Sequence, residues 1–145
     1  MPKTLIVGSD HAGIDLKREL SGVAAELGYE LVDLGTHSSD STDYPDWAHL
    51  VAGAVARGEG LGLLVCGTGI GMSIAANRHA GVRAALCGDV FSASMSRRHN
   101  DANVLCIGAR VVGGGLAAEI LKAFLSASFE GGRHERRVKK IEPSA

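Results

Sequence analysis

Residues 61–78 read LGLLVCGTGIGMSIAANR, and this stretch is the most informative about the fold of the chain. The apolar run from Leu63 to Val65 is typical of a buried parallel strand. The glycine-rich residues 67–71 predict a tight turn, and residues 72–78 predict a helix. A strand, a glycine turn and a helix in that order leave unpaired backbone N–H groups at one point. Such a point favours an anion or a developing oxyanion.

Cys66 ends the predicted strand and is expected to face these N–H groups. A helix N-terminus favours the thiolate form of a cysteine, so Cys66 is a candidate nucleophile or base. An inert thiol in the core is the alternative interpretation. A Walker A loop is excluded because no Gly-Lys-Ser or Gly-Lys-Thr follows the turn. A dinucleotide-binding turn fits poorly because Met72 stands where the third glycine is required, although Asp89 could bind a ribose.

Composition limits the class of protein. The chain has 145 residues, of which 46% are hydrophobic and 21% charged, and this suits one soluble domain. The net charge of −1 argues against nucleic acid or an anionic membrane as the main partner. The three cysteines lack C-x-x-C spacing, which favours a reduced compartment. We recognise no signal peptide or membrane-spanning run, so we expect a cytoplasmic protein.

Apolar periodicity predicts strands and helices in alternation. Strands are expected at residues 4–9, 30–34, 63–66, 83–87 and 104–107, and further helices at residues 13–27, 45–58, 89–99 and 115–127. The short connections indicate a parallel sheet covered on both faces. We therefore expect an α/β fold, a Rossmann-like three-layer α/β/α sandwich with a five-stranded parallel sheet, as a single domain over residues 1–145. A charged C-terminal tail, about residues 130–145, is expected to complete the site or an oligomer interface.

Polar residues follow three of the predicted strands. Asp10 and His11 follow the first, Cys66 ends the third, and Arg110 follows the fifth. Because ligands bind outside the carboxyl ends of parallel strands, these side chains are expected to converge on one edge of the sheet. Asp10 could instead serve only to accept backbone N–H bonds before the next helix.

Other candidate residues lie later in the chain. His99 and Asn100 lie at a predicted helix end, where a histidine either interacts with the helix dipole or serves in acid–base chemistry. Arg133 and Arg137 are four residues apart, so on a helix both guanidinium groups could bind one phosphate, and Arg110 could join them. A solvated basic tail is the alternative. No H-E-x-x-H or similar spacing predicts a metal site.

Five motifs occur in an order that resembles a known family. They are GSDHAG at residues 8–13, TDYPD at 42–46, CGTGIG at 66–71, HNDANV at 99–104 and EGGRH at 130–134. Together they resemble the type B ribose-5-phosphate isomerases, a family that includes the galactose-6-phosphate isomerase subunits. The resemblance covers essentially the whole chain. It implies interconversion of an aldose phosphate and a ketose phosphate without a metal or organic cofactor.

The resemblance also implies roles for particular residues. Cys66 would be the base and His99 the acid that opens the sugar ring. Asp10 would either assist His99 or bind the substrate by orienting its hydroxyls. The Thr68 hydroxyl and the amides of the turn would hold the enediolate oxygen; these amides belong to Gly67, Thr68, Gly69, Ile70 and Gly71. Substrate and phosphate would be bound by His11, Tyr44, Asn100, Arg110, Arg133 and Arg137. One branch of the family uses a glutamate where this chain has Met72, so the cysteine mechanism is the better assignment.

The family is dimeric or tetrameric, and the resemblance therefore implies a homodimer or homotetramer. His99 and Asn100 are expected to approach Cys66 from a neighbouring chain. A subunit that is active only with a different partner chain is disfavoured because this chain carries the full set of residues. Two further alternatives are an isomerase of allose 6-phosphate, galactose 6-phosphate or a tetrulose phosphate, and a non-catalytic nucleotide-binding module.

Overall fold

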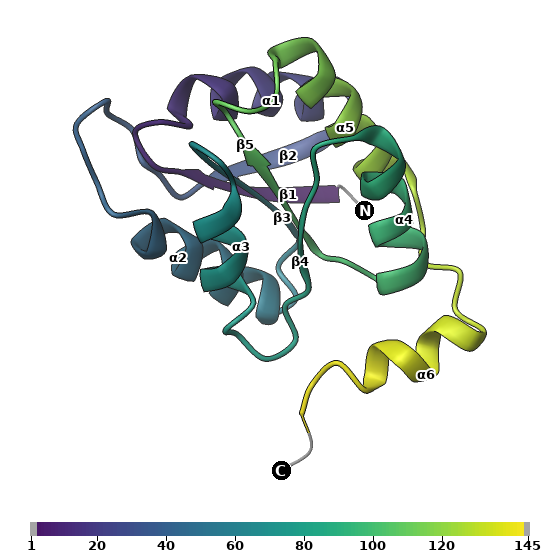
Figure 1. Ribbon diagram of the computed structural model, residues 1–145. Helices are drawn as coiled ribbons and strands as arrows, with labels where there is room; N and C mark the ends of the chain where they lie inside the picture. The colour runs from purple at the N-terminus through teal and green to yellow at the C-terminus, as the bar shows by residue number, and fades with distance from the viewer. Residues whose placement is uncertain (1–2, 144–145) are drawn as a thin grey trace.

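The computed structural model describes residues 3–143, in which strands and helices alternate along the chain (Figure 1). The strands are β1 (Lys3–Ser9), β2 (Tyr29–Asp33), β3 (Leu61–Cys66), β4 (Ala84–Leu86) and β5 (Val104–Gly108). The helices are α1 (Ile14–Glu26), α2 (Tyr44–Ala56), α3 (Ile70–Ala76), α4 (Val90–Asn100), α5 (Gly114–Ser126) and α6 (Arg133–Lys139). The predicted elements are confirmed, although α3 begins two residues earlier than expected. Its N-cap is Gly69, whose left-handed backbone ends the turn directly before Ile70.

All five strands are parallel, in the order β2-β1-β3-β5-β4. The chain passes from β1 to β2 on one side and then returns to place β3 on the other side of β1. This reversal makes the gap between the carboxyl ends of β1 and β3 a topological switch point, where open α/β sheets bind ligands. Ser9 pairs with Val65 at this point, so Asp10 and Cys66 are brought to the same edge.

Helices cover both faces of the sheet, which confirms the expected three layers (Figure 1). On one face, β1, β3 and β5 pack against α1, α4 and α5 through a core that includes Leu20, Leu63, Ala93, Ile107 and Phe124. On the other face, α2 and α3 pack through a core that includes Ile6, Val51, Leu64, Met72 and Cys106. Burial of β3 on both faces explains its continuous apolar sequence.

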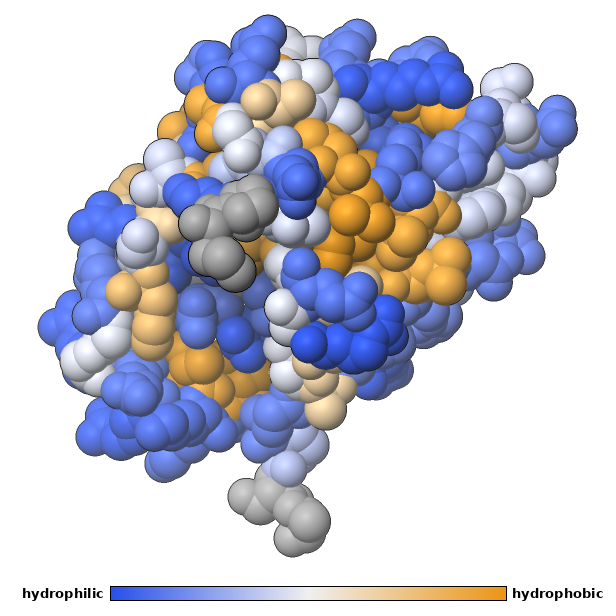
Figure 2. All heavy atoms as spheres, turned by 180° about the vertical axis from the view of Figure 1, so that it is seen from behind, coloured by the Kyte–Doolittle hydropathy of each residue, from blue (hydrophilic) through white to orange (hydrophobic). Residues whose placement is uncertain are grey.

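Helix α6 lies apart from these layers (Figure 1). It contacts α4, and none of its residues is buried. The face opposite the one in Figure 1 has a patch of apolar side chains surrounded by polar ones (Figure 2). Within residues 3–143, no helix is both long and apolar enough to cross a membrane.

Candidate active site

The turn after β3 directs backbone N–H groups at the Cys66 thiol. Gly69 has φ 78°, a conformation that L residues with a side chain rarely adopt. In this conformation the Gly69 N–H donates to Cys66 Sγ at 3.1 Å. The expectation that the thiol faces the turn is thus confirmed, even though Cys66 is buried against the core below it.

The remaining groups of the turn are arranged to bind an oxygen anion. The Ile70 N–H donates to Thr68 Oγ1 at 3.2 Å, which leaves the hydroxyl hydrogen of Thr68 for a ligand. The N–H groups of Gly71 and Met72, in the first turn of α3, have no acceptor among residues 3–143. Unpaired N–H groups and the helix dipole act together at this position, so the turn can stabilise negative charge beside a sulfur atom.

Two of the predicted substrate-binding side chains flank the turn. A Cβ atom at Gly71 would lie only 2.4 Å from the Tyr44 ring, so glycine is needed there for the ring to approach. On the other side, a Cβ at Gly67 would lie 3.3 Å from Arg110 Nη1. The Arg110 N–H also donates to the Gly67 carbonyl at 2.9 Å, which fixes the start of the Arg110 side chain beside the turn.

Asp10 and His11 lie at the neighbouring strand end. Asp10 Oδ1 accepts the N–H groups of Ala12 at 3.0 Å and Gly13 at 3.1 Å, as expected of a residue that orders the start of α1. The Asp10 N–H donates to the Val65 carbonyl at 3.3 Å, which ties this residue to β3. His11 Nδ1 accepts the Thr42 N–H at 3.2 Å, so the loop before α2 closes over this edge.

The other predicted residues lie at the opposite edge of the sheet. His99 and Asn100 end α4, which runs antiparallel to the strands, and they line a cavity of about 360 Å³ with His134 and Arg137. β3 separates the two edges by ~16 Å along its length. Within one chain, the structure therefore divides the predicted site into two groups. Cys66, Thr68, Asp10, His11, Tyr44 and Arg110 form one group, and His99, Asn100, Arg133 and Arg137 belong to the other.

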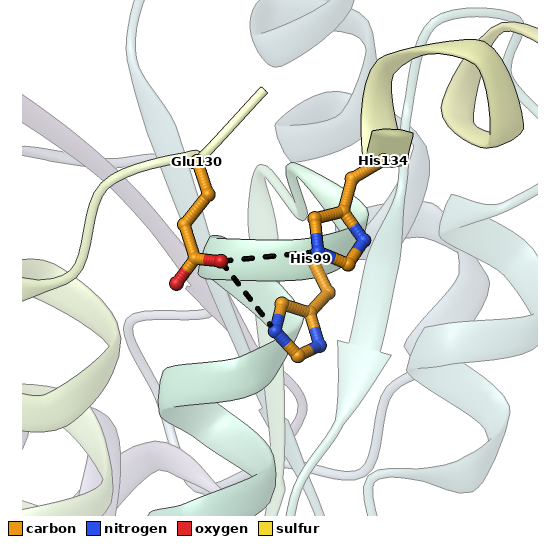
Figure 3. A group of neighbouring side chains, drawn as sticks. All are labelled: His99, Glu130 and His134. Atoms are coloured by element: carbon orange, nitrogen blue, oxygen red, sulfur yellow. Dashed lines mark ion pairs between the residues drawn. The ribbon is translucent and has the colours of Figure 1, made fainter. Parts of the chain in front are cut away.

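His134 and Glu130, which belong to the EGGRH motif but were assigned no role of their own, lie beside His99 (Figure 3). The His99 and His134 rings stack with centroids 4.2 Å apart and an angle of 11°. Glu130 Oε1 lies 3.7 Å from His99 Nε2 and 3.8 Å from His134 Nε2. Burial, followed by the charges of His99 and Arg133, lowers the pKa of His134.

The other two thiols are poor candidates for a base. Burial, with a contribution from Asp89, raises the pKa of Cys87 to about 11. Burial also raises the pKa of Cys106. Both thiols stay protonated near neutral pH, so of the three cysteines only Cys66 combines a position at the site with a donor on its sulfur.

The class of protein follows from comparison with known families. Residues 5–141 match the Ribose/Galactose Isomerase family, and the chain belongs to it. The resemblance to the type B ribose-5-phosphate isomerases is confirmed, and the chain is an aldose–ketose isomerase of this class.

Particular relatives are similar over nearly the whole chain. The ribose-5-phosphate isomerase B of Escherichia coli is 53% identical over 140 residues, which are 96% of this chain and 94% of the relative. The ribose-5-phosphate isomerase B structure from Clostridium thermocellum is 52% identical and has a TM-score of 0.93. The match covers 95% of this chain and 94% of the Clostridium thermocellum chain. The ribose-5-phosphate isomerase B structure from Mycoplasma genitalium, solved with bound ribulose-5-phosphate, is 43% identical and has a TM-score of 0.94. The match covers 97% of this chain and 95% of the Mycoplasma genitalium chain.

Proposed function

We propose that the chain interconverts ribose 5-phosphate and ribulose 5-phosphate, with Cys66 as the base. The observation that carries the proposal is the 3.1 Å contact between Cys66 Sγ and the Gly69 N–H at the topological switch point. The relative from Mycoplasma genitalium, which was solved with bound ribulose-5-phosphate, supports the choice of substrate.

The reaction moves a carbonyl from C1 to C2 of the open-chain sugar. The Cys66 thiolate takes the proton from C2, the electron pair forms the C1–C2 double bond, and the carbonyl oxygen becomes negative. The Thr68 hydroxyl and the N–H groups of Gly71 and Met72 hold that oxygen, whose charge develops only along the reaction path. The C2 hydroxyl then gives its proton to the negative oxygen on C1, which becomes a hydroxyl. As the ketone forms at C2, the electron pair of the double bond takes the proton back from the thiol at C1, and Cys66 is again a thiolate.

Ring opening requires an acid, and we assign this role to His99 of a second copy of the chain. His99 of the same chain lies at the far edge of the sheet, ~16 Å from the Cys66 turn along β3. Apolar side chains next to the turn support contact with a second copy. Ile70, Leu86 and Val111 are 50%, 43% and 69% exposed and line one hollow with Thr68. Exposed apolar clusters of this kind are typical of protein–protein interfaces.

The second copy would also bring Asn100, Arg133 and Arg137 to the substrate. In each chain His99, Asn100 and Arg137 already line one cavity, so they would arrive as a preassembled group. Two arginines one helical turn apart match a phosphate because each presents paired donors in a plane. The tail about residues 130–145 would then complete the site of the neighbouring chain.

The experiment that tests the assignment of the base is Cys66→Ala. We expect kcat to fall by ~10³-fold, which is typical of a lost general base, with KM nearly unchanged. The coupled isomerisation assay should include allose 6-phosphate, galactose 6-phosphate and a tetrulose phosphate as competing substrates. Unchanged kcat in the variant would contradict the role of Cys66, and faster turnover of another sugar phosphate would contradict the choice of substrate.

A further inference from the structure

We propose that His99, Glu130 and His134 form a binding site for a divalent transition-metal ion of the zinc type. The three residues come from the end of α4, from the segment between α5 and α6, and from α6. Their ligand atoms all lie within 4.8 Å of one another. Figure 3 shows that both imidazole rings turn a nitrogen toward the same carboxylate oxygen. Nothing in the proposed isomerase mechanism requires this convergence.

The distances are close to those that a zinc ion requires. Nitrogen and oxygen ligands about 2.0–2.1 Å from a tetrahedral ion lie ~3.4 Å from one another. Glu130 Oε1 lies 3.7 Å from His99 Nε2 and 3.8 Å from His134 Nε2. These two distances exceed the required spacing by only ~0.3–0.4 Å, and the two histidine nitrogens lie within 4.8 Å of each other. Side-chain movements of no more than ~1.4 Å would therefore bring the three atoms onto one ion, with water in the fourth position.

Glu130 is held so that Oε1 stays available to an ion. Its Oε2 accepts a hydrogen bond from Arg98 Nε at 2.6 Å, and its N–H donates to the Arg98 carbonyl at 3.0 Å. Such outer contacts fix the orientation of a metal-binding carboxylate. Arg98, Arg133 and Arg137 add positive charge nearby, which weakens cation binding and disfavours Mg²⁺ or Ca²⁺. Two imidazoles and one carboxylate instead suit Zn²⁺, Co²⁺ or Ni²⁺.

A bound ion would switch off the role that the proposed function gives to His99, and this consequence rests on that function. An imidazole whose Nε2 is coordinated cannot become imidazolium, so it no longer serves as an acid near neutral pH. Zinc should therefore slow the turnover of ribose 5-phosphate, which must be opened from its ring. Zinc should leave the turnover of erythrose 4-phosphate unchanged. The hydroxyl of this sugar that would close a five-membered ring carries the phosphate, so the sugar stays open and needs no ring-opening acid.

The test is direct titration of the purified oligomer with Co²⁺ in a phosphate-free buffer, followed by visible absorbance and calorimetry. We expect one ion per chain. The variants Glu130→Gln and His134→Asn should each weaken binding by ~10-fold or more. His49→Asn is the matched histidine control, because His49 also lies beside a second histidine. Its Nδ1 is 2.8 Å from His79 Nε2. Glu135→Gln is the carboxylate control, since Glu135 pairs with Lys139 on α6.

Equal binding by the wild type and both cluster variants would overturn the proposal, as would loss of binding in His49→Asn alone. The measurement is independent of activity. If Co²⁺ binds as expected but ribose 5-phosphate is not isomerised, the proposed function fails and the metal site stands. If the isomerase is active but Co²⁺ does not bind, the metal site fails alone.

Discussion

Gly69 determines how the Cys66 sulfur is contacted. Its N–H donates to Sγ, its φ of 78° directs the chain from the turn into α3, and its lack of a side chain lets the turn pack against β5. A Cβ atom at this position would lie 2.6 Å from Leu86 Cδ1 and 2.9 Å from the Ile107 carbonyl carbon. Both the backbone angle and the space available therefore require glycine.

The variant Gly69→Ala tests this requirement, with Gly81→Ala as its control. Gly81 has φ 82°, and a Cβ atom there would have no neighbour within 4 Å, so alanine meets only the backbone penalty of about 1 kcal/mol. Gly69→Ala should cost a further ~1–3 kcal/mol from the close contacts and lower kcat by ~10–100-fold. Urea unfolding and steady-state kinetics measure the two effects. Equal stability and activity of the two variants would contradict the argument.

Single residues were predictable from the sequence where a strand end or a motif marked them. Cys66 ends a strand, and the glycine turn, Asp10 and Arg110 each follow one, so the edge that they share could be predicted. Glu130 and His134 belong to the EGGRH motif, but nothing in the motif indicated that they lie beside His99. They are four residues apart, but α6 begins only at Arg133, and their partner His99 belongs to α4. The cluster exists because the chain folds back, which no local spacing indicates.

At the scale of elements, a buried lysine joins α1 to β2 and to the loop that follows β2. The Lys17 side chain is 1% exposed, and its Nζ donates to Asp33 Oδ1 at 2.8 Å and to the Thr36 carbonyl at 2.6 Å. This loop continues to Thr42, whose N–H contacts His11. The ion pair therefore supports one wall of the candidate site from a distance.

Asp33→Ala should destabilise the protein by ~2 kcal/mol because it leaves the Lys17 charge buried without its partner; the partial exposure of Asp33 keeps the cost below that of a fully buried pair. Lys17→Met should cost less, since it removes the charge itself. Arg18→Met, which removes an exposed pair with Asp15, should change stability by no more than ~0.5 kcal/mol. Urea unfolding tests the order of the three variants. A larger loss in Arg18→Met than in Asp33→Ala would refute it.

The type of most elements could be predicted, but their order in the sheet could not. Continuous apolar runs mark β3 and β5 as strands buried on both faces. The insertion of β5 between β3 and β4 depends on which helix and sheet faces pack together, and not on any local pattern. The packing of α4 on α5 is one such contact. The sequence of α6 likewise did not predict that this helix lies apart from the layers.

At the scale of the whole molecule, the chain carries two groups of functional residues at opposite edges of one rigid sheet. The Cys66 group contains the proposed base and oxyanion site, and the His99 group contains an imidazole and arginines. Neither group is sufficient for the proposed reaction with a cyclic sugar phosphate. The central claim is therefore that a working site is built from two copies of the chain.

Activity of a mixed oligomer tests this claim most directly. Chains carrying Cys66→Ala and chains carrying His99→Asn are co-expressed with different tags, and assemblies that contain both are purified through the two tags in turn. Each variant alone should be slow with ribose 5-phosphate. In a mixed dimer one of the two sites combines an intact Cys66 with an intact His99, so we expect about half of the wild-type kcat per dimer. Activity no higher than the mean of the two separate variants would contradict a site shared between chains.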